Sequence, residues 1–158
     1  MAPLGPPAPF PDVALPGLDG RRRAISEAWA KGWALIVIGH GDCETTRSTL
    51  PFVDRIHRRR APTSTALAVL QDEAREARAL VEELALELPV RLEEEPYPLA
   101  ARLALGTVPT LFLVDHHGRI DTVAEAFRRA DLEAFAARLQ VPAPFFLPTD
   151  DAPALRPG

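Results

Sequence analysis

The sequence predicts an α/β domain in which helices cover both faces of a mixed β-sheet. Residues 33–40, WALIVIGH, form a near-continuous apolar run, which suits a strand buried on both faces. Such runs alternate with helical segments, of which residues 72–87 are the most clearly amphipathic. Strands that alternate with helices lie mostly parallel in one sheet. The last two predicted strands are joined by a short turn, so they must pair antiparallel and make the sheet mixed.

The predicted elements follow one another with short connections. Strands are expected at residues 12–15, 33–40, 64–71, 89–93, 110–115 and 119–127. Helices are expected at residues 23–30, 44–59, 72–87, 98–105 and 130–139, with Ser26, Asp42, Asp72 and Asp131 as candidate N-caps. The glutamates at 93–95 are expected in a solvated loop, and HHG at 116–118 in the turn of the final hairpin.

Composition and charge exclude several classes of function. The chain has 158 residues, of which 47% are hydrophobic, and this is ordinary for a globular protein. Its net charge is −4, so we expect no nucleic-acid partner, and the short arginine runs at 21–23 and 58–60 are expected to be solvated. No apolar stretch approaches the roughly 18 residues of a membrane-spanning helix, so we expect no membrane partner.

The beginning of the chain and its cysteine count favour a cytoplasmic location. Residues 1–17 contain neither a basic start nor an apolar core, unlike a secretory signal. The single cysteine, Cys43, cannot form an internal disulfide. The histidines are scattered without ligand spacing and no glycine-rich phosphate loop is present, so we expect neither a metal nor a cofactor.

Proline is concentrated at the two ends of the chain. Six of the 17 prolines lie within the first 16 residues, and five follow Val141. We therefore expect an extended arm at residues 1–10, one domain at 11–139 and a proline-rich tail at 140–158. Phe145 and Phe146 in the tail either pack on the domain's own surface or contact another chain, which is a different partner or a second subunit in a homodimer through the tail.

The only thiol lies where a buried strand ends and a helix begins. The first amides of a helix carry partial positive charge, which stabilises a thiolate at Cys43. Asp42 and Glu44 flank the sulfur with negative charge and oppose this effect, while Arg47 lies one turn further on and offsets them. The alternative role for Cys43 is that of a small buried hydrophobic residue. His40 is either a proton donor or a hydrogen-bonded loop histidine.

Three segments, spread over most of the chain, carry a resemblance to a known family. Residues 8–39 resemble its opening hairpin, short helix and first core strand. Residues 43–52, CETTRSTLPF, resemble its active-site helix, with Cys43 at the first cysteine of C-x-x-C. Residues 108–120, VPTLFLVDHHGRI, resemble its cis-proline segment. Together these segments resemble the thioredoxin superfamily, specifically its branch of TlpA-like thiol–disulfide oxidoreductases and peroxiredoxins (thiol-specific antioxidants).

The resemblance implies a thioredoxin-like fold, with three α/β/α layers around a central mixed sheet and an N-terminal β-hairpin extension. It also implies that Val108, Pro109 and Thr110 lie against the cysteine, that Pro109 is cis, and that this loop binds a partner chain by backbone pairing. His40 and Asp42, just before the cysteine, are further candidates for substrate binding.

The departures from the family pattern are equally informative. Thr46 stands at the second cysteine of the motif, and Asp42 replaces the tryptophan that usually precedes the first. The peroxiredoxin pattern P-x-x-x-T-x-x-C is absent, because its proline falls on Ile36 and its threonine on His40. The chain therefore lacks both a resolving thiol and the usual peroxide environment.

Three functions remain open on this basis. The first is a monothiol oxidoreductase that exchanges disulfides through Cys43, with an external thiol as resolving agent. By resemblance, Thr46 would donate a hydrogen bond to the thiolate, although it is equally well an ordinary helix residue; Arg47 is the third candidate catalytic residue. The others are a redox-inactive binding module and a one-cysteine peroxidase. Expected partners are a protein or a low-molecular-weight thiol or disulfide.

Overall fold

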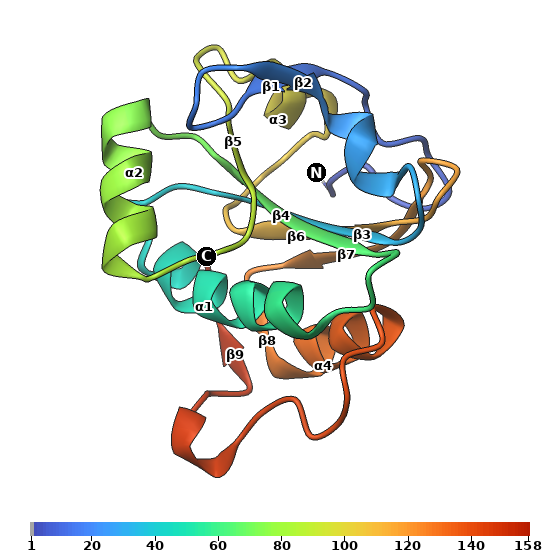
Figure 1. Cartoon of the computed structure of the whole chain (residues 1–158), viewed down its shortest axis with the longest axis vertical. Helices are drawn as coiled ribbons and strands as arrows, with labels where there is room; N and C mark the ends of the chain where they lie inside the picture. Colours follow the sequence, from blue (N-terminus) through green and yellow to red (C-terminus); the bar gives the residue numbers. More distant parts are fainter. Residues whose placement is uncertain (1) are drawn as a thin grey trace.

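The computed structural model describes residues 2–158, and a five-stranded mixed sheet lies at its centre (Figure 1). In spatial order its strands are β5 (Val90–Leu92), β4 (Thr65–Leu70), β3 (Ala34–Gly39), β6 (Thr110–Val114) and β7 (Ile120–Glu125). The first three run parallel, whereas β6 is antiparallel to β3 and β7 to β6. The sheet is mixed as predicted, but parallel pairs do not predominate, because β6 enters antiparallel to the central strand.

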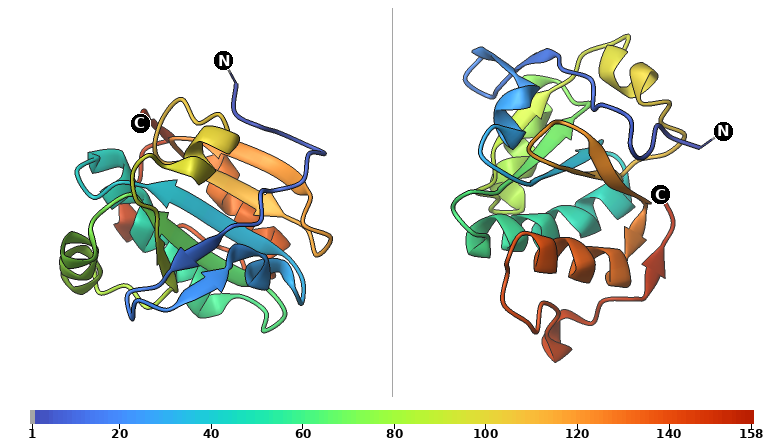
Figure 2. Two further views of the ribbon diagram at one scale, coloured as in Figure 1. Left: turned by 90° about the horizontal axis from the view of Figure 1, so that it is seen from above. Right: turned by 90° about the vertical axis from the view of Figure 1, so that its right-hand side faces the viewer.

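Helices and a hairpin cover the two faces of this sheet, as Figures 1 and 2 show. One face is covered by three helices, α1 (Glu44–Arg59), α2 (Ala74–Glu83) and α4 (Arg129–Arg138). The other is covered by β1 (Ala14–Pro16), β2 (Arg22–Ala24), the 3-10 helix η1 (Ile25–Trp29) and α3 (Pro98–Arg102). The predicted three layers and N-terminal hairpin are confirmed. Within residues 2–158, no helix has the length and apolar character needed to cross a membrane.

The central strand β3 contributes side chains to both hydrophobic cores. Leu35 and Val37 pack in the core that α1, α2 and α4 share. Ile36 and Ile38 pack in the opposite core, under the hairpin and α3. Successive side chains of a strand point to opposite faces. An apolar run without alternation is therefore what a strand covered on both sides requires, as predicted for residues 33–40.

The predicted N-caps are wrong, although the helices are present. The residues at the N-cap positions of η1, α1, α2 and α4 are Ala24, Cys43, Glu73 and Arg128, and none of them makes a side-chain cap hydrogen bond. Ser26, Asp42 and Asp72 thus do not cap, and Asp131 lies within the first turn of α4. At least one of these side chains has a tertiary role, because Asp72 binds a backbone amide of the loop that precedes α1.

Glu93 corrects the prediction of a solvated acidic loop. Glu94 and Glu95 are exposed, but only 1% of the Glu93 surface is accessible. Its Oε1 accepts hydrogen bonds from the amides of Leu99 (2.5 Å) and Ala100 (3.0 Å). These amides lie in the first turn of α3, where backbone N–H groups have no partner within the helix. The buried carboxylate therefore supplies the acceptors that start this short helix.

The N-terminal arm packs against the domain. Phe10 is buried and makes edge-on contacts with Trp29 and Phe112, at ring-centroid distances of 5.7 and 5.4 Å. The backbone of the arm is also held, because the Leu4 amide donates to the Leu103 carbonyl oxygen at 2.8 Å. The arm therefore completes the core beneath the hairpin.

The proline-rich tail folds back over the face that carries α1 and α4 (Figures 1 and 2). Phe145 and Phe146 are buried, and both rings lie close to Phe52 of α1. Asp150, at the end of the 3-10 helix η2 (Pro148–Asp150), accepts two hydrogen bonds of 2.8 Å from the Arg55 guanidinium. The middle of the tail is thus anchored to its own domain by aromatic packing and by a bidentate ion pair.

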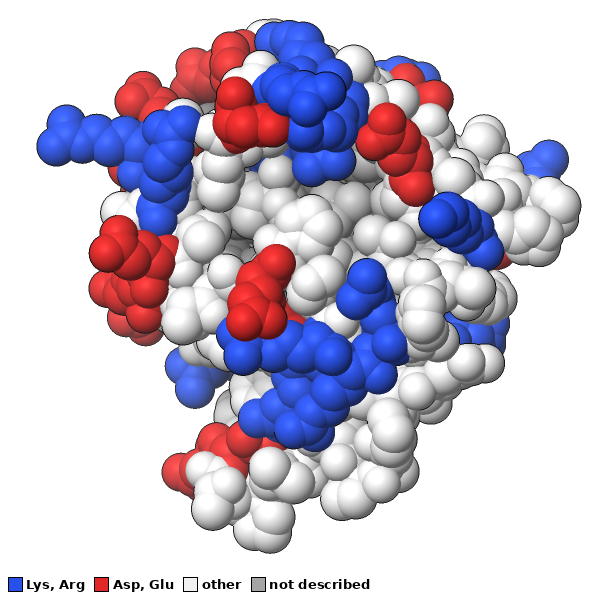
Figure 3. Space-filling view, viewed as in Figure 1, with Lys and Arg blue, Asp and Glu red and all other residues white. Residues whose placement is uncertain are grey.

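Charged side chains of both signs occupy the face drawn in Figure 3, and arginines gather over the region of α1. Arg58 in this helix donates to the buried carboxylate of Asp54 at 2.7 Å. The same carboxylate accepts the amides of Glu87 and Leu88, each at 2.8 Å. Part of the positive charge over α1 is therefore neutralised by a carboxylate beneath it.

The buried carboxylate at the start of α3 predicts a large difference between neighbouring glutamates. We expect Glu93→Ala to lower the free energy of unfolding by about 1–3 kcal/mol, because two amides lose a charged acceptor. The matched control, Glu94→Ala, is expected to change it by less than about 0.5 kcal/mol, since that side chain is exposed. Urea denaturation measures both changes, and equal effects would contradict the role given to Glu93.

The anchor of the tail predicts an acid-sensitive contribution to stability. Hydrogen bonds from Arg55 lower the pKa of the Asp150 carboxyl from 3.8 to about 2. A lowered pKa means that the pair contributes fully above about pH 4 and loses its contribution as the pH falls through about 2. We expect Asp150→Asn to destabilise the chain at neutral pH and the difference from the parent to shrink with acidification. Urea denaturation measures both chains down to the lowest pH at which they fold. A difference in unfolding free energy that stays constant with pH would refute this prediction.

Candidate functional site

Cys43 lies at the junction between the loop after β3 and the first residue of α1. It is half-buried and has no disulfide partner. Its amide donates to the His40 carbonyl oxygen, and its own carbonyl accepts the Arg47 amide, each at 3.0 Å. Its Sγ lies 3.5 Å from the carbonyl oxygen of Val108. The fold therefore places the thiol at a helix N-terminus and against a loop 65 residues further along the chain.

The loop that faces the sulfur leads directly into β6. The peptide bond between Val108 and Pro109 is cis. Thr110, the first residue of β6, is buried and donates from Oγ1 to the Thr107 carbonyl oxygen at 2.8 Å. The Pro109 carbonyl accepts the Ala126 amide at 2.8 Å. Three of the five residues predicted for substrate binding, Val108, Pro109 and Thr110, thus lie in one hydrogen-bonded loop, of which Val108 approaches the sulfur.

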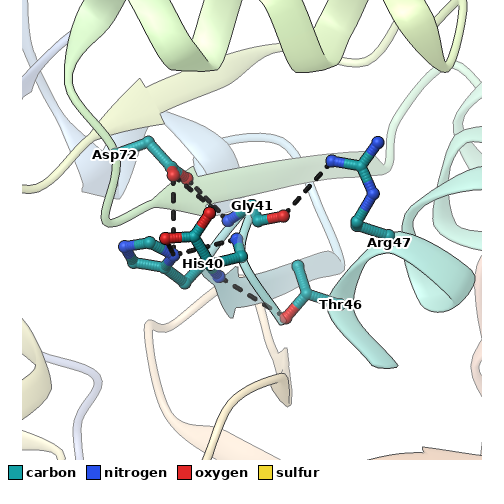
Figure 4. A network of polar contacts seen from close by, with 6 residues as sticks. His40, Gly41, Thr46, Arg47 and Asp72 are labelled. Carbon is teal, nitrogen blue, oxygen red and sulfur yellow. Dashed lines mark hydrogen bonds and ion pairs between the residues drawn. The ribbon is translucent and has the colours of Figure 1, made fainter. Parts of the chain in front are cut away.

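The loop between β3 and the cysteine is held by a network of polar contacts (Figure 4). The Gly41 amide donates to both carboxylate oxygens of Asp72, at 2.9 and 3.2 Å. The Asp42 amide donates to His40 Nδ1 at 3.0 Å, so this nitrogen acts as an acceptor. The same nitrogen lies 3.6 Å from Asp72 and 3.8 Å from the Asp42 carboxylate. The His40 ring therefore faces the loop and the carboxylates of Asp42 and Asp72.

Asp72 is the residue of this network that sequence reasoning assigned to another role. It follows β4, whose end lies beside that of β3 because the two strands are parallel neighbours. Only 5% of its side chain is exposed. A Cβ at Gly41 would lie 3.1 Å from its Oδ1, which is a close approach for a side chain. Its position after a buried parallel strand was the available signal, because the carboxyl ends of such strands meet at one edge of a sheet.

Thr46, at the second cysteine of the family motif, is completely buried. Its Oγ1 accepts a hydrogen bond from the His40 amide at 3.4 Å. The side chain also packs on the end of β3, where a Cβ at Gly39 would lie 2.5 Å from Thr46 Cγ2 and 2.9 Å from Oγ1. Only glycine fits at this crossing of strand and helix. The hydroxyl that was expected to face the thiolate is thus hydrogen-bonded to the preceding loop.

The Arg47 side chain has one polar partner and one charged partner. Its guanidinium donates to the Gly41 carbonyl oxygen at 3.2 Å and forms an ion pair with Glu83 of α2. The positive charge expected to offset the acids near the thiol is therefore itself paired. The Asp42 side chain is 97% exposed, so that solvent screens its charge.

The contact between Cys43 and Val108 belongs to the protonated thiol. A thiol donates a weak hydrogen bond, whereas a thiolate has no proton to donate and would face the carbonyl dipole directly. The arrangement offers one nucleophile and a neighbouring backbone carbonyl. Among residues 2–158, no group of three or more histidine, cysteine, aspartate or glutamate side chains is arranged to hold a metal ion.

The far end of the tail also reaches this site. The Thr45 hydroxyl, at the start of α1, donates to the Pro157 carbonyl oxygen. Gly158 lies so close to the loop before β6 that a Cβ would collide with the Val108 carbonyl and the Thr107 hydroxyl. Sequence reasoning missed this contact, because a proline-rich segment carries no periodic pattern that would indicate where it docks.

Comparisons with solved structures identify the fold. A structure described as the thiol:disulfide interchange protein DsbE of Chlorobium tepidum has a TM-score of 0.75 and 22% identity, over 85% of this chain and 94% of its own. The thioredoxin domain of a thiol-disulfide oxidoreductase from Bacteroides vulgatus has a TM-score of 0.74 and 16% identity, over 85% and 96%. Peroxidoxin BcpB of Mycobacterium tuberculosis has a TM-score of 0.70 and 16% identity, over 85% and 95%.

One of these neighbours is described as a thioredoxin domain, and the chain has the thioredoxin-like fold that its sequence predicted. No protein-family model matches the chain, and no curated protein sequence matches it. The particular form of the fold found here has one cysteine, with Thr46 at the position of the second cysteine of the motif.

The two aspartates beside His40 provide a matched test of this geometry. We expect Asp72→Ala to lower the free energy of unfolding by about 1–3 kcal/mol and to speed hydrogen exchange at the Gly41 amide, which loses its charged acceptor. Asp42→Ala removes an exposed carboxylate and is expected to change stability by less than about 0.5 kcal/mol. Unchanged protection of the Gly41 amide in Asp72→Ala would rule out the role given to this carboxylate.

Proposed function

We propose that the chain is a monothiol oxidoreductase of the thioredoxin fold that exchanges disulfides through Cys43. The observation that carries this proposal is the position of the sulfur, half-buried at the start of α1 and 3.5 Å from the loop before Pro109. A helix N-terminus favours a thiolate, and the thiolate is the nucleophile in disulfide exchange. The likeness to structures described as thiol–disulfide oxidoreductases supports a redox role in general.

The proposed reaction has two steps that balance without a second cysteine in the chain. The Cys43 thiolate attacks one sulfur of a disulfide R–S–S–R′, forming a Cys43–S–S–R bond as R′S⁻ leaves and takes up a proton. An external thiolate then attacks the sulfur of R, so that Cys43 leaves as thiolate and the external thiol becomes joined to R. The candidate partners are accordingly a protein disulfide and a low-molecular-weight thiol.

The surrounding residues have positioning roles in this scheme. Asp72 holds the Gly41 amide and thereby fixes the turn from which the cysteine emerges. Thr46 ties the first turn of α1 to the end of β3 through the His40 amide. Val108 lies where an extended partner segment would pass the sulfur. Before attack, the thiol must give up both its proton and its contact with the Val108 carbonyl.

The test is the formation and resolution of a mixed disulfide. We expect the native chain, held overnight with oxidised glutathione, to gain one glutathione per chain, and added reduced thiol to remove it. Intact mass spectrometry measures both steps. Cys43→Ser is the negative control because the chain contains no other cysteine, and the urea-unfolded chain reports the intrinsic reactivity of the same thiol. An adduct on the unfolded chain alone would overturn the proposal.

A specific observation favours a second candidate, a redox-inactive module that binds partners beside the Pro109 loop. The thiol is hydrogen-bonded to a carbonyl, and the nearby cation Arg47 is paired with Glu83. This candidate predicts that Cys43→Ser retains partner binding and that native Cys43 resists exchange. For a one-cysteine peroxidase, the test would be Cys43-dependent consumption of peroxide with dithiothreitol.

The homodimer expected through the tail stays a prediction. Its motivating side chains, Phe145 and Phe146, are buried within their own chain. Leu147 and Leu155 are the exposed large hydrophobic residues of the tail, where a second copy would bury apolar surface. Sedimentation velocity of the parent chain and of Leu147→Ser would test for such a dimer.

A further inference from the structure

Residues near the end of the tail add a strand to the domain. β9 (Leu155–Arg156) pairs antiparallel with β8 (Phe127–Arg128), which follows β7 closely. The Arg129 amide extends this pairing with a hydrogen bond of 3.0 Å to the Ala154 carbonyl oxygen. Adding an extended segment to an exposed strand is a recurrent way in which proteins bind peptides. The tail thus occupies a backbone edge that would otherwise be open to another chain.

Beyond this strand, the tail passes the thiol itself. Pro157 accepts a hydrogen bond from Thr45, which lies two residues after Cys43. Gly158 lies against Val108, whose carbonyl oxygen is the hydrogen-bond acceptor of the Cys43 thiol. One contact is with the first turn of the helix that begins after Cys43, and the other is with the residue whose carbonyl oxygen the thiol contacts. Figures 1 and 2 show the chain end beside the beginning of α1.

The terminal contacts are of a weaker kind than those of the middle of the tail. Residues 155–158 are exposed, with Leu155 at 50%, and their contacts are made by backbone atoms. Residues 145–152 are instead held by buried aromatic rings, by the Arg55–Asp150 pair and by the Arg129 side chain on the Ala152 carbonyl. Segments with few buried side chains open first. The end of the tail can therefore leave the site while its middle stays docked.

We propose that residues 155–158 act as an intramolecular occupant of the partner-binding surface beside Cys43 and must leave before a disulfide partner reaches the sulfur. This inference rests on the proposed function, since it assigns the occupied surface to the partner of that reaction. The surface takes an extended peptide, bound mainly through its backbone. The position opposite Val108 takes glycine, because any side chain there collides with the carbonyl.

The test uses full-length variants and the alkylation rate of Cys43. Gly158→Val introduces a collision with the Val108 carbonyl, and Thr45→Val removes the hydroxyl that binds Pro157. We expect both variants to raise the second-order rate constant for reaction of Cys43 with iodoacetamide by about tenfold. This is the increase expected if the segment is open about one-tenth of the time in the parent and always open in the variants. The matched control, Leu155→Ala, keeps the backbone contacts and is expected to leave the rate unchanged.

A peptide supplied in trans separates occupancy from a general loosening of the fold. The probe is a synthetic peptide with the sequence of residues 152–158, APALRPG. We expect it to slow alkylation of Gly158→Val back toward the parental rate and to leave the parent unaffected. Equal alkylation rates in the parent and in both variants would overturn the proposal, as would a faster rate that the peptide does not reduce.

Glutathione exchange, measured on the same variants, distinguishes failure of this inference from failure of the proposed function. Faster alkylation that the peptide reverses, without any glutathione adduct, would uphold the occupancy and overturn the oxidoreductase. If the glutathione adduct forms at the same rate in the parent and in both variants, the oxidoreductase would be upheld and occupancy of the site by the tail would be overturned.

Discussion

The burial of β3 on both faces is the constraint on which the rest of the structure depends. Every residue of this strand is buried, so neither its register nor its direction can shift without exposing one of the two cores. The strand ends at Gly39, where the absence of a side chain lets Thr46 of α1 pack on its backbone. Strand and helix are thereby joined at a fixed crossing. The position of Cys43, which lies between them, is fixed as well.

Much of the fold could be predicted, because hydrophobic periodicity records which faces are covered. The order of strands and helices, the final hairpin and the bounds of α1 follow from such patterns. The direction of β6 in the sheet was less accessible, since it depends on the path of the chain around a short α3. The 3-10 geometry of η1 and the pairing of β8 with β9 likewise carry no periodic signal.

The polar part of the site was predicted less well, because a side chain that can cap a helix can equally accept a hydrogen bond from another backbone amide. Asp72 satisfies Gly41, and Glu93 satisfies the first turn of α3 from outside that helix. Sequence places Cys43 and the Pro109 loop in one site only through family resemblance. Propensity does not specify their contact, since the sulfur and the Val108 carbonyl meet across 65 residues of chain.

The anchoring of the tail by Arg55 and Asp150 changes the kind of competition that an incoming partner meets. A tethered segment faces its docking surface at an effective concentration set by the short length of chain beyond the anchor, which is in the millimolar range for such tethers. Diluting the protein does not weaken this occupant, and a free partner loses about tenfold in apparent affinity to a segment that is open about one-tenth of the time. In this proposal, the Arg55–Asp150 pair that anchors the tail on α1 sets how strongly the terminal segment competes for the site.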